Sequence, residues 1–169
     1  DNSYFQESRC LDSNGNDDMA RILERAERMI ENGATILDIG ACSTRPGSDP
    51  VGEEEEWRRL EPALTAIRRV FPDIDLSVDT YWPSVVRKTF DAIGRFIVND
   101  VTAGEGMYEK VNADVPGEML GTVAHLGLPF VAMHMRGNPK TMQSLTEYSD
   151  VVSDVVEYFR RFSEKAARA

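Results

Sequence analysis

The sequence contains little cysteine and little histidine, which limits the disulfide and metal chemistry that it can support. Its 169 residues include 2 Cys and 2 His. Cys10 and Cys42 are far apart and lack the spacing of metal ligands, so we expect reduced thiols, as in a cytoplasmic protein. His125 and His134 are too few for a site built from several histidines.

Positive charge is also scarce, and long apolar runs are missing. The chain has 19 Lys and Arg against 29 Asp and Glu, a net charge of −10. A nucleic-acid-binding surface needs a basic face, so we expect no nucleic-acid partner, and any anion site must be a local exception. No apolar run is long enough to span a membrane, and no membrane partner is expected. The hydrophobic content of 41% fits one globular domain over residues 1–169.

Segments with strand and helix patterns alternate along the chain. Asn16 and Asp17 are predicted to cap a first helix that ends near Gly33. Pro62 predicts a kink or a break in the helix that begins near residue 53. Strands are predicted at 35–41, 74–80, 95–101 and 129–135, with further helices at 83–94, at 116–127 and from about 149. The core face of the last helix is predicted to carry Val152, Val155, Val156, Phe159 and Phe162.

Strands that alternate with helices predict an α/β fold with a parallel sheet, either open or closed into a barrel. Polar residues favour the barrel. Arg45, Asp79, Asn99 and His134 lie at or just past the ends of successive strands. In a (β/α)8 TIM barrel these ends converge on one mouth, where active sites are built. Such a barrel usually needs about 250 residues, so the chain is interpreted as part of one.

Four motifs, in this order, resemble the dihydropteroate synthase family. They are LDIGACSTRPG at 37–47, SVDT at 77–80, IVNDV at 97–101 and MHMRGNPKTMQ at 133–143. The opening residues resemble the first mobile loop of that family, with Ser3, Tyr4 and Phe5 in it. Simple fraying of a chain end is the alternative for that loop. One departure is Cys42, where many members of the family have Glu.

The resemblance implies an eight-stranded barrel, of which this chain supplies strands two to five, and a domain that continues at both ends. It implies a transferase of folate biosynthesis that joins para-aminobenzoate to dihydropterin pyrophosphate and releases pyrophosphate. It also implies a cytoplasmic homodimer that uses Mg²⁺, with a ligand Asn upstream of Asp1 and no metal ligand within this chain. A second pterin-binding Asp, a Lys, and an Arg and His for the phosphate are expected after Ala169.

Thr44, Arg45 and Pro46 are the candidate anion-binding residues. Arg is a planar cation that can hold phosphate or carboxylate oxygens in two parallel hydrogen bonds. Both pyrophosphate and the aminobenzoate carboxylate are anions, so Arg45 is predicted to bind one of them and to act in catalysis. The alternative is that Arg45 pairs with the four glutamates at 53–56.

Asp79, Asn99 and Met133 are the candidate pterin-binding residues. A carboxylate at a strand end can accept hydrogen bonds from a ring N–H and an amino group, and the resemblance gives Asp79 a catalytic role near the dihydropterin ring. Asn99 can both donate and accept, and Met133 can pack on a flat ring. The alternatives are a helix cap for Asp79, local backbone bonds for Asn99 and core filling for Met133. Asp100 is predicted to order the turn that follows it.

Two other functions stay open on the sequence. A barrel that passes a methyl group from methyl-tetrahydrofolate to a corrinoid would share the Asp and the Asn, but it has no pyrophosphate to hold. A pterin-binding fragment without catalysis is the other alternative. The charges of Arg136 and Lys140 are interpreted as anion attraction or as plain solvation.

Overall fold

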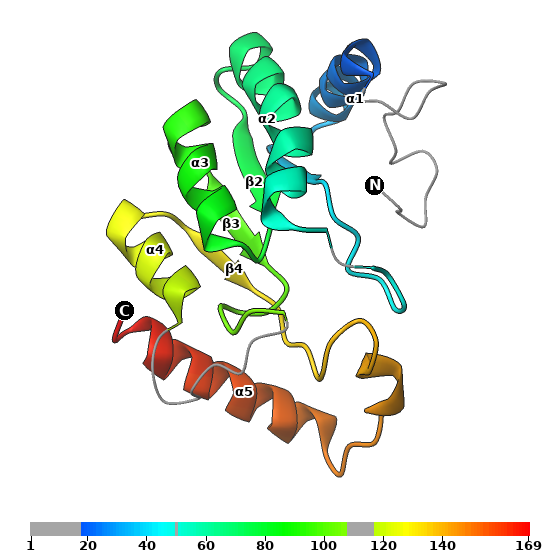
Figure 1. The fold of residues 1–169 in the computed structure, drawn as a ribbon, viewed down its shortest axis with the longest axis vertical. Coiled ribbons are helices and arrows are strands. Elements are labelled where there is room, and N and C mark those ends of the chain that lie inside the picture. Colours follow the sequence, from blue (N-terminus) through cyan, green and yellow to red (C-terminus); the bar gives the residue numbers. More distant parts are fainter. Residues whose placement is uncertain (1–17, 50, 108–116) are drawn as a thin grey trace.

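The computed structural model describes residues 18–49, 51–107 and 117–169, which form a parallel sheet with helices along it (Figure 1). The sheet has four strands in the order β1-β2-β3-β4, and every neighbouring pair is parallel. The chain therefore connects each strand to the next parallel strand through a helix, as predicted for an α/β fold. The elements are α1 (Met19–Glu31), β1 (Ile36–Gly40), α2 (Glu53–Val70), β2 (Asp75–Asp79), α3 (Pro83–Ile93), β3 (Ile97–Asp100), α4 (Glu118–Leu126), β4 (Phe130–Ala132), the short 3₁₀ helix η2 (Met142–Ser144) and α5 (Val151–Ala166).

The N-cap of the first helix lies one residue later than predicted. Asp18 is the N-cap of α1, and its side chain accepts a hydrogen bond from the Arg21 N–H at 3.1 Å. A capping side chain must reach the N–H two or three residues inside the helix. Asp18 meets that spacing, so the prediction of Asn16 and Asp17 as the cap was wrong.

Pro62 does not break α2. The helix runs from Glu53 to Val70 with Pro62 inside it. Proline removes one backbone hydrogen bond, but the buried side chains of Leu60, Leu64 and Ile67 hold the helix against the sheet on both sides of that gap. Of the predicted kink or break, the break is therefore wrong, because tertiary packing outweighs the local cost.

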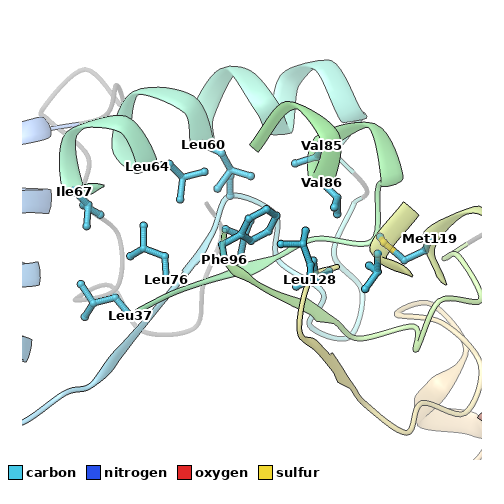
Figure 2. Packing of buried hydrophobic residues seen from close by; sticks show 14 of the residues in the cluster. Leu37, Leu60, Leu64, Ile67, Leu76, Val85, Val86, Phe96, Met119 and Leu128 are labelled. Carbon is cyan, nitrogen blue, oxygen red and sulfur yellow. The ribbon is translucent and has the colours of Figure 1, made fainter. Parts of the chain in front are cut away.

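The core lies between the helices and one face of the sheet. Figure 2 shows the side chains of α2 above Leu37 of β1 and Leu76 of β2. Val78 and Val98 continue this buried layer on β2 and β3. Side chains alternate between the two faces of a strand, so the residues between these apolar positions point to the other face.

The fourth strand is shorter than predicted. β4 covers Phe130–Ala132, not residues 129–135. Its partner β3 ends at Asp100, which pairs with Ala132. Beyond this pair, β3 offers no further residue for β4 to pair with. Met133 and His134 therefore lie beyond the strand, and placing His134 on a strand was wrong.

The core face of α5 was only partly predicted. Phe162 stacks on Phe130 of β4 with ring centroids 5.8 Å apart, and Phe159 packs edge-on against Phe162. Val152 and Val156 are 67% and 63% exposed, so their predicted place in the core was wrong. None of the helices in the described ranges is long and apolar enough to cross a membrane.

Candidate active site

Two predicted site residues lie side by side at the carboxyl end of the sheet. Asp79 is the last residue of β2, and its register partner on β3 is Asn99. Asn99 pairs in turn with Val131 of β4, whose side chain is 50% exposed. Register partners point to the same side of a sheet. Asp79 and Asn99 therefore share the face opposite the helix-covered core, which we call the open face.

Asp38 of β1 joins this pair, and the sequence analysis missed it. The Asn99 amide nitrogen lies 3.4 Å from each carboxylate oxygen of Asp38 and donates to them. Asp38 stands inside a run otherwise composed of apolar residues and Gly. That lone charge in a strand pattern was the available signal, because a carboxylate there must face away from the apolar core.

Gly40 keeps the space beside Asp79 open. It is the register partner of Asp79 on β1. A Cβ at Gly40 would lie 3.2 Å from the Asp79 Cβ and 3.4 Å from its Oδ2. Any side chain here would therefore crowd the carboxylate. Glycine leaves that side of Asp79 accessible at the end of β1.

Asp79 lies in an electrostatic environment that favours its protonated form. Burial, the largest cause, and the nearby carboxylates of Asp38, Glu56 and Asp100 together raise the pKa of Asp79 from 3.8 to about 7. Removal from water and like charges both disfavour a carboxylate. Asp79 can thus gain or lose a proton near neutral pH, and a cationic or hydrogen-bond-donating ligand would stabilise its charged form.

The hydrogen bonds of Asp79's neighbours argue against its alternative role as a helix cap. The N-cap of α3 is Trp82, and no side chain makes a capping hydrogen bond there. The Trp82 N–H instead donates to Thr80 Oγ1 at 3.2 Å. The carboxylate of Asp79 is therefore not used to begin α3.

The loop that contains Thr44, Arg45 and Pro46 follows β1 and crosses toward the loop after β4. The Ser48 N–H donates to the Arg45 carbonyl at 3.1 Å, which closes a turn. Gly47, with φ of +75°, donates its N–H to the Pro139 carbonyl at 2.9 Å. Loops from the two outer strands of the sheet thus meet at its carboxyl end, and the turn of Arg45 is held there.

The glutamates at the start of α2 have partners of their own. Glu54 pairs with Lys88 at 2.9 Å, and Glu55 pairs with Arg58 and Arg59 at 2.7 Å. Glu53 accepts from Ser84, and Glu56 accepts from Thr80. The glutamate run therefore has partners on α2, on α3 and at the end of β2.

Asp100 orders the turn after β3, as predicted. Its Oδ1 accepts from the Thr102 N–H at 2.7 Å and the Thr102 hydroxyl at 2.8 Å. Its Oδ2 accepts from the Gly104 N–H at 2.8 Å. Both carboxylate oxygens are bonded and the residue is fully buried, so Asp100 stabilises the loop that follows β3.

Met133 and the charged residues near it lie past the end of β4. The Met133 side chain is 42% exposed, so it does not fill the core. The His134 ring packs edge-on against Tyr158 with centroids 4.8 Å apart. Arg136 lies 4.7 Å from the ring of Tyr148 and donates to the Glu147 carbonyl at 2.6 Å. This part of the mouth is therefore lined by aromatic rings and by a cation with local partners.

Comparison with known proteins assigns the family. Residues 5–169 match the family described as pterin binding enzyme. The chain belongs to the pterin-binding enzyme family. The resemblance carried by the four motifs is thereby confirmed.

Three relatives of this pterin-binding chain are named as dihydropteroate synthases. That of Escherichia coli K12 is 42% identical over 137 residues, which are 81% of this chain and 44% of that protein. The Yersinia pestis enzyme, solved with a sulfonamide drug, has a TM-score of 0.79 at 32% identity and covers 96% of this chain and 55% of its own. The Xanthomonas albilineans enzyme, solved with 4-aminobenzoic acid, has a TM-score of 0.72 at 36% identity and covers 88% and 48%. The chain thus spans about half the length of these relatives, with the predicted α/β fold.

Two further predictions for this pterin-binding enzyme concern a mobile loop and a metal ion. Ser3, Tyr4 and Phe5, assigned to a mobile loop, lie outside the described residues. Within the described ranges, no group of three or more His, Cys, Asp or Glu side chains could hold a metal ion. The described side chains therefore do not form a Mg²⁺ site among themselves.

Proposed function

We propose that the full-length protein containing this chain is a dihydropteroate synthase. It would join para-aminobenzoate to dihydropterin pyrophosphate and release pyrophosphate. The observation that carries the proposal is the cluster of Asp38, Asp79 and Asn99 on the open face of the sheet in a pterin-binding enzyme. The loop of Arg45 comes to the same end of the sheet.

The cluster on the open face has the hydrogen-bonding chemistry that a pterin needs. A pterin edge presents ring N–H and amino donors next to a carbonyl acceptor. Asp79 supplies acceptors, and the Asn99 amide supplies both a donor and an acceptor. Asn99 is oriented by its contact with Asp38, so its amide is held ready for the ring. Burial removes water from the Asp79 carboxylate. Hydrogen bonds from a bound pterin would take the place of that water and favour the charged form of Asp79.

Arg45 supplies the charge that the second substrate or the leaving group needs. A guanidinium held in a turn beside Gly47 can bind the aminobenzoate carboxylate or a phosphate in two parallel bonds. The Xanthomonas albilineans relative was solved with 4-aminobenzoic acid, which supports this class of ligand. Thr44 and Pro46 flank Arg45 and would shape the same pocket.

The reaction follows from these roles. The C–O bond between the pterin methylene and pyrophosphate breaks, and its electron pair leaves with pyrophosphate. The resulting cation is stabilised by the negative charge of Asp79. The amine lone pair of para-aminobenzoate forms the new C–N bond, and the nitrogen then loses a proton to solvent. No oxidant or reductant is required, and no step depends on a metal held by this chain.

The rest of the protein would complete the site. We propose that the described sheet is part of one barrel domain whose other strands cover the open face, since the chain spans about half of its relatives. The homodimer and the Asn ligand for Mg²⁺ before Asp1 are proposed from the family resemblance. The free, buried thiol of Cys42 supports a cytoplasmic setting.

Turnover assays test the proposal. Purified full-length protein should release pyrophosphate only when dihydropterin pyrophosphate and para-aminobenzoate are both present. Titration with the pterin substrate alone should show binding without release. Turnover of methyl-tetrahydrofolate with a corrinoid instead, or pterin binding without any turnover, would replace the proposed reaction by one of the other two functions.

The role of Arg45 has its own test within this assay. Arg45→Ala should raise the KM for para-aminobenzoate far more than it changes pterin binding, because its cation is assigned to the anion. Arg69→Ala, which removes an exposed Arg from the far end of α2, is the matched control and should change neither. Equal loss of both substrates in Arg45→Ala would refute this assignment.

A further inference from the structure

Glu56 is a buried carboxyl group that none of the roles above uses. It lies in the first turn of α2 and is 0% exposed. Its Oε1 accepts from the Thr80 hydroxyl at 2.5 Å. Its Oε2 has no hydrogen-bond partner in the described structure. Thr80 directly follows Asp79, so this contact reaches the residue next to the pterin cluster.

Thr80 bonds to three elements through its side chain and its backbone N–H. Its hydroxyl donates to Glu56 of α2 and accepts from the Trp82 N–H at the start of α3. Its own N–H donates to the Asn99 carbonyl of β3 at 3.0 Å. Thr80 is itself 1% exposed. The backbone that leaves Asp79 is therefore held from α2, α3 and β3 together.

The place of Glu56 on α2 would suit an apolar residue. It lies one turn before Leu60, on the face that also buries Leu64 and Ile67. A buried carboxyl is costly unless it is hydrogen-bonded, and one of its oxygens has no partner within the described residues. Its contribution to stability is thus small or unfavourable, while its effect on the orientation of Thr80 is direct. Without an acceptor at Glu56, the Thr80 hydroxyl is free to rotate away from the Trp82 N–H.

We propose that Glu56 is a positioning residue for pterin binding. Its carboxyl oxygen fixes the rotamer of Thr80, and Thr80 fixes the direction in which Asp79 and Asn99 present their side chains to the ring. Glu56 itself does not touch substrate. This inference rests on the proposed function and deepens it, because it assigns a residue on a helix to the alignment of the pterin-binding pair.

The oxygen that accepts from Thr80, more than the charge of Glu56, carries this role. Burial raises the pKa of Glu56 to about 7, although the Thr80 hydrogen bond acts against that rise. A carboxyl that is partly protonated at neutral pH still offers Oε1 as an acceptor. An amide at the same position would offer the same oxygen. Glu56→Gln should therefore preserve the geometry, whereas Glu56→Ala should lose it.

The test compares matched variants of the full-length protein by calorimetric titration with dihydropterin pyrophosphate and by steady-state kinetics. Glu56→Ala should weaken pterin binding about tenfold, or about 1.4 kcal/mol, because Asp79 and Asn99 would be less well oriented toward the ring. The KM for para-aminobenzoate should stay unchanged, because its assigned cation lies on another loop. Glu56→Gln should restore binding to near the unmodified value. Glu54→Ala, on the same turn but exposed and paired with Lys88, should change nothing.

Variants of Thr80, the partner of Glu56, provide a second test if Glu56→Ala folds poorly. Thr80→Val should weaken pterin binding as Glu56→Ala does, and Thr80→Ser should retain it. The double variant Glu56→Ala/Thr80→Val should be no weaker than Thr80→Val alone, since both remove one contact. A merely structural role would lower the unfolding midpoint but leave the pterin Kd of the folded protein unchanged, and that result would overturn the proposal.

The outcomes separate this inference from the proposed function. Binding of dihydropterin pyrophosphate decides the role of Glu56, and pyrophosphate release decides the reaction. Unmodified protein that turns over normally, with Glu56→Ala binding the pterin as tightly as before, would overturn the positioning role alone. Protein that binds the pterin and responds to these variants but never releases pyrophosphate would support the positioning role and overturn the reaction.

Discussion

The two faces of the sheet use the same four strands for different purposes. On the helix-covered face, Leu37, Leu76, Val78 and Val98 are almost wholly buried beneath the helices (Figure 2). On the open face, the alternate positions place carboxylates and an amide beside exposed apolar side chains. Because side chains alternate along a strand, each short strand contributes to both faces. One face stabilises the fold, and the other presents the chemistry.

The largest effect should come from leaving the open face uncovered. Within the described residues, no further strand pairs with the outer edges of β1 and β4. These edges and the exposed apolar side chains of Ile36 (47%), Val131 (50%) and Met133 (42%) favour association. We expect residues 1–169 expressed alone to associate and to release no pyrophosphate. Light scattering and the turnover assay measure this, with the full-length protein as control. A monomer with one cooperative unfolding transition and normal turnover would contradict it.

A cavity on the helix-covered face should lower the stability of the protein. Leu64 of α2 is 0% exposed in the core cluster. Leu64→Ala in the full-length protein should lower the free energy of unfolding by about 2–5 kcal/mol, the cost of an unfilled core site. Glu61→Ala on the exposed side of the same helix should stay within about 0.5 kcal/mol. Denaturant unfolding compares the two, and equal losses would remove the distinction between the faces.

The open face should respond in binding instead of stability. Asp79→Asn should weaken pterin binding by about 1–3 kcal/mol, the scale for a lost charged hydrogen bond. It should not lower the free energy of unfolding at neutral pH, because burial already disfavours the Asp79 charge. Asp75→Asn, at the exposed start of the same strand, is the control. Calorimetric titration would contradict the prediction if both variants bound the pterin as tightly as the unmodified protein.

A further effect should appear in the pH dependence of stability. Burial raises the pKa of Asp79 from 3.8 and of Glu56 from 4.5, each to about 7. Between about pH 4 and about pH 7 the folded state then binds more protons than the unfolded state, so these groups make stability fall as pH rises. Above about pH 7 both states are ionised and the fall ends.

Replacing both groups should flatten that fall. Asp79→Asn combined with Glu56→Gln removes two of the groups whose ionisation disfavours the fold. Asp100, whose pKa is also raised by burial, stays in place and leaves part of the slope. Urea unfolding across this pH range measures the change. A slope that stayed the same or became steeper would show that these two carboxyl groups are ordinary acids in the folded protein.

Much of the fold could be predicted from local patterns. The apolar runs and their helical spacing located all four strands, and the start of α2 at Glu53 and of α3 at Pro83 was correct. The errors lie where a distant contact decides. The end of β4 depends on where β3 stops, and the exposure of Val152 depends on what α5 packs against.

From the sequence, only the site residues at the ends of strands could be predicted. The order of the motifs placed Asp79 and Asn99 on neighbouring strands, and the register confirms that they are partners. Asp38 was missed because its role depends on a contact 61 residues away, with Asn99. Glu56 was grouped with the other glutamates at 53–56, since nothing local marks it as buried.

The sequence alone determined the alternation of strands and helices, the family and the residue types available at the strand ends, because these depend on periodicity and on motif order. Only the tertiary structure decided which acidic residues are solvated and which are buried. Glu54 and Glu56 are two residues apart on one helix, yet one pairs with Lys88 in solvent and the other bonds Thr80 in the core. A turn of 3.6 residues places them on different sides of α2, and the sheet beneath one side removes water from Glu56 alone.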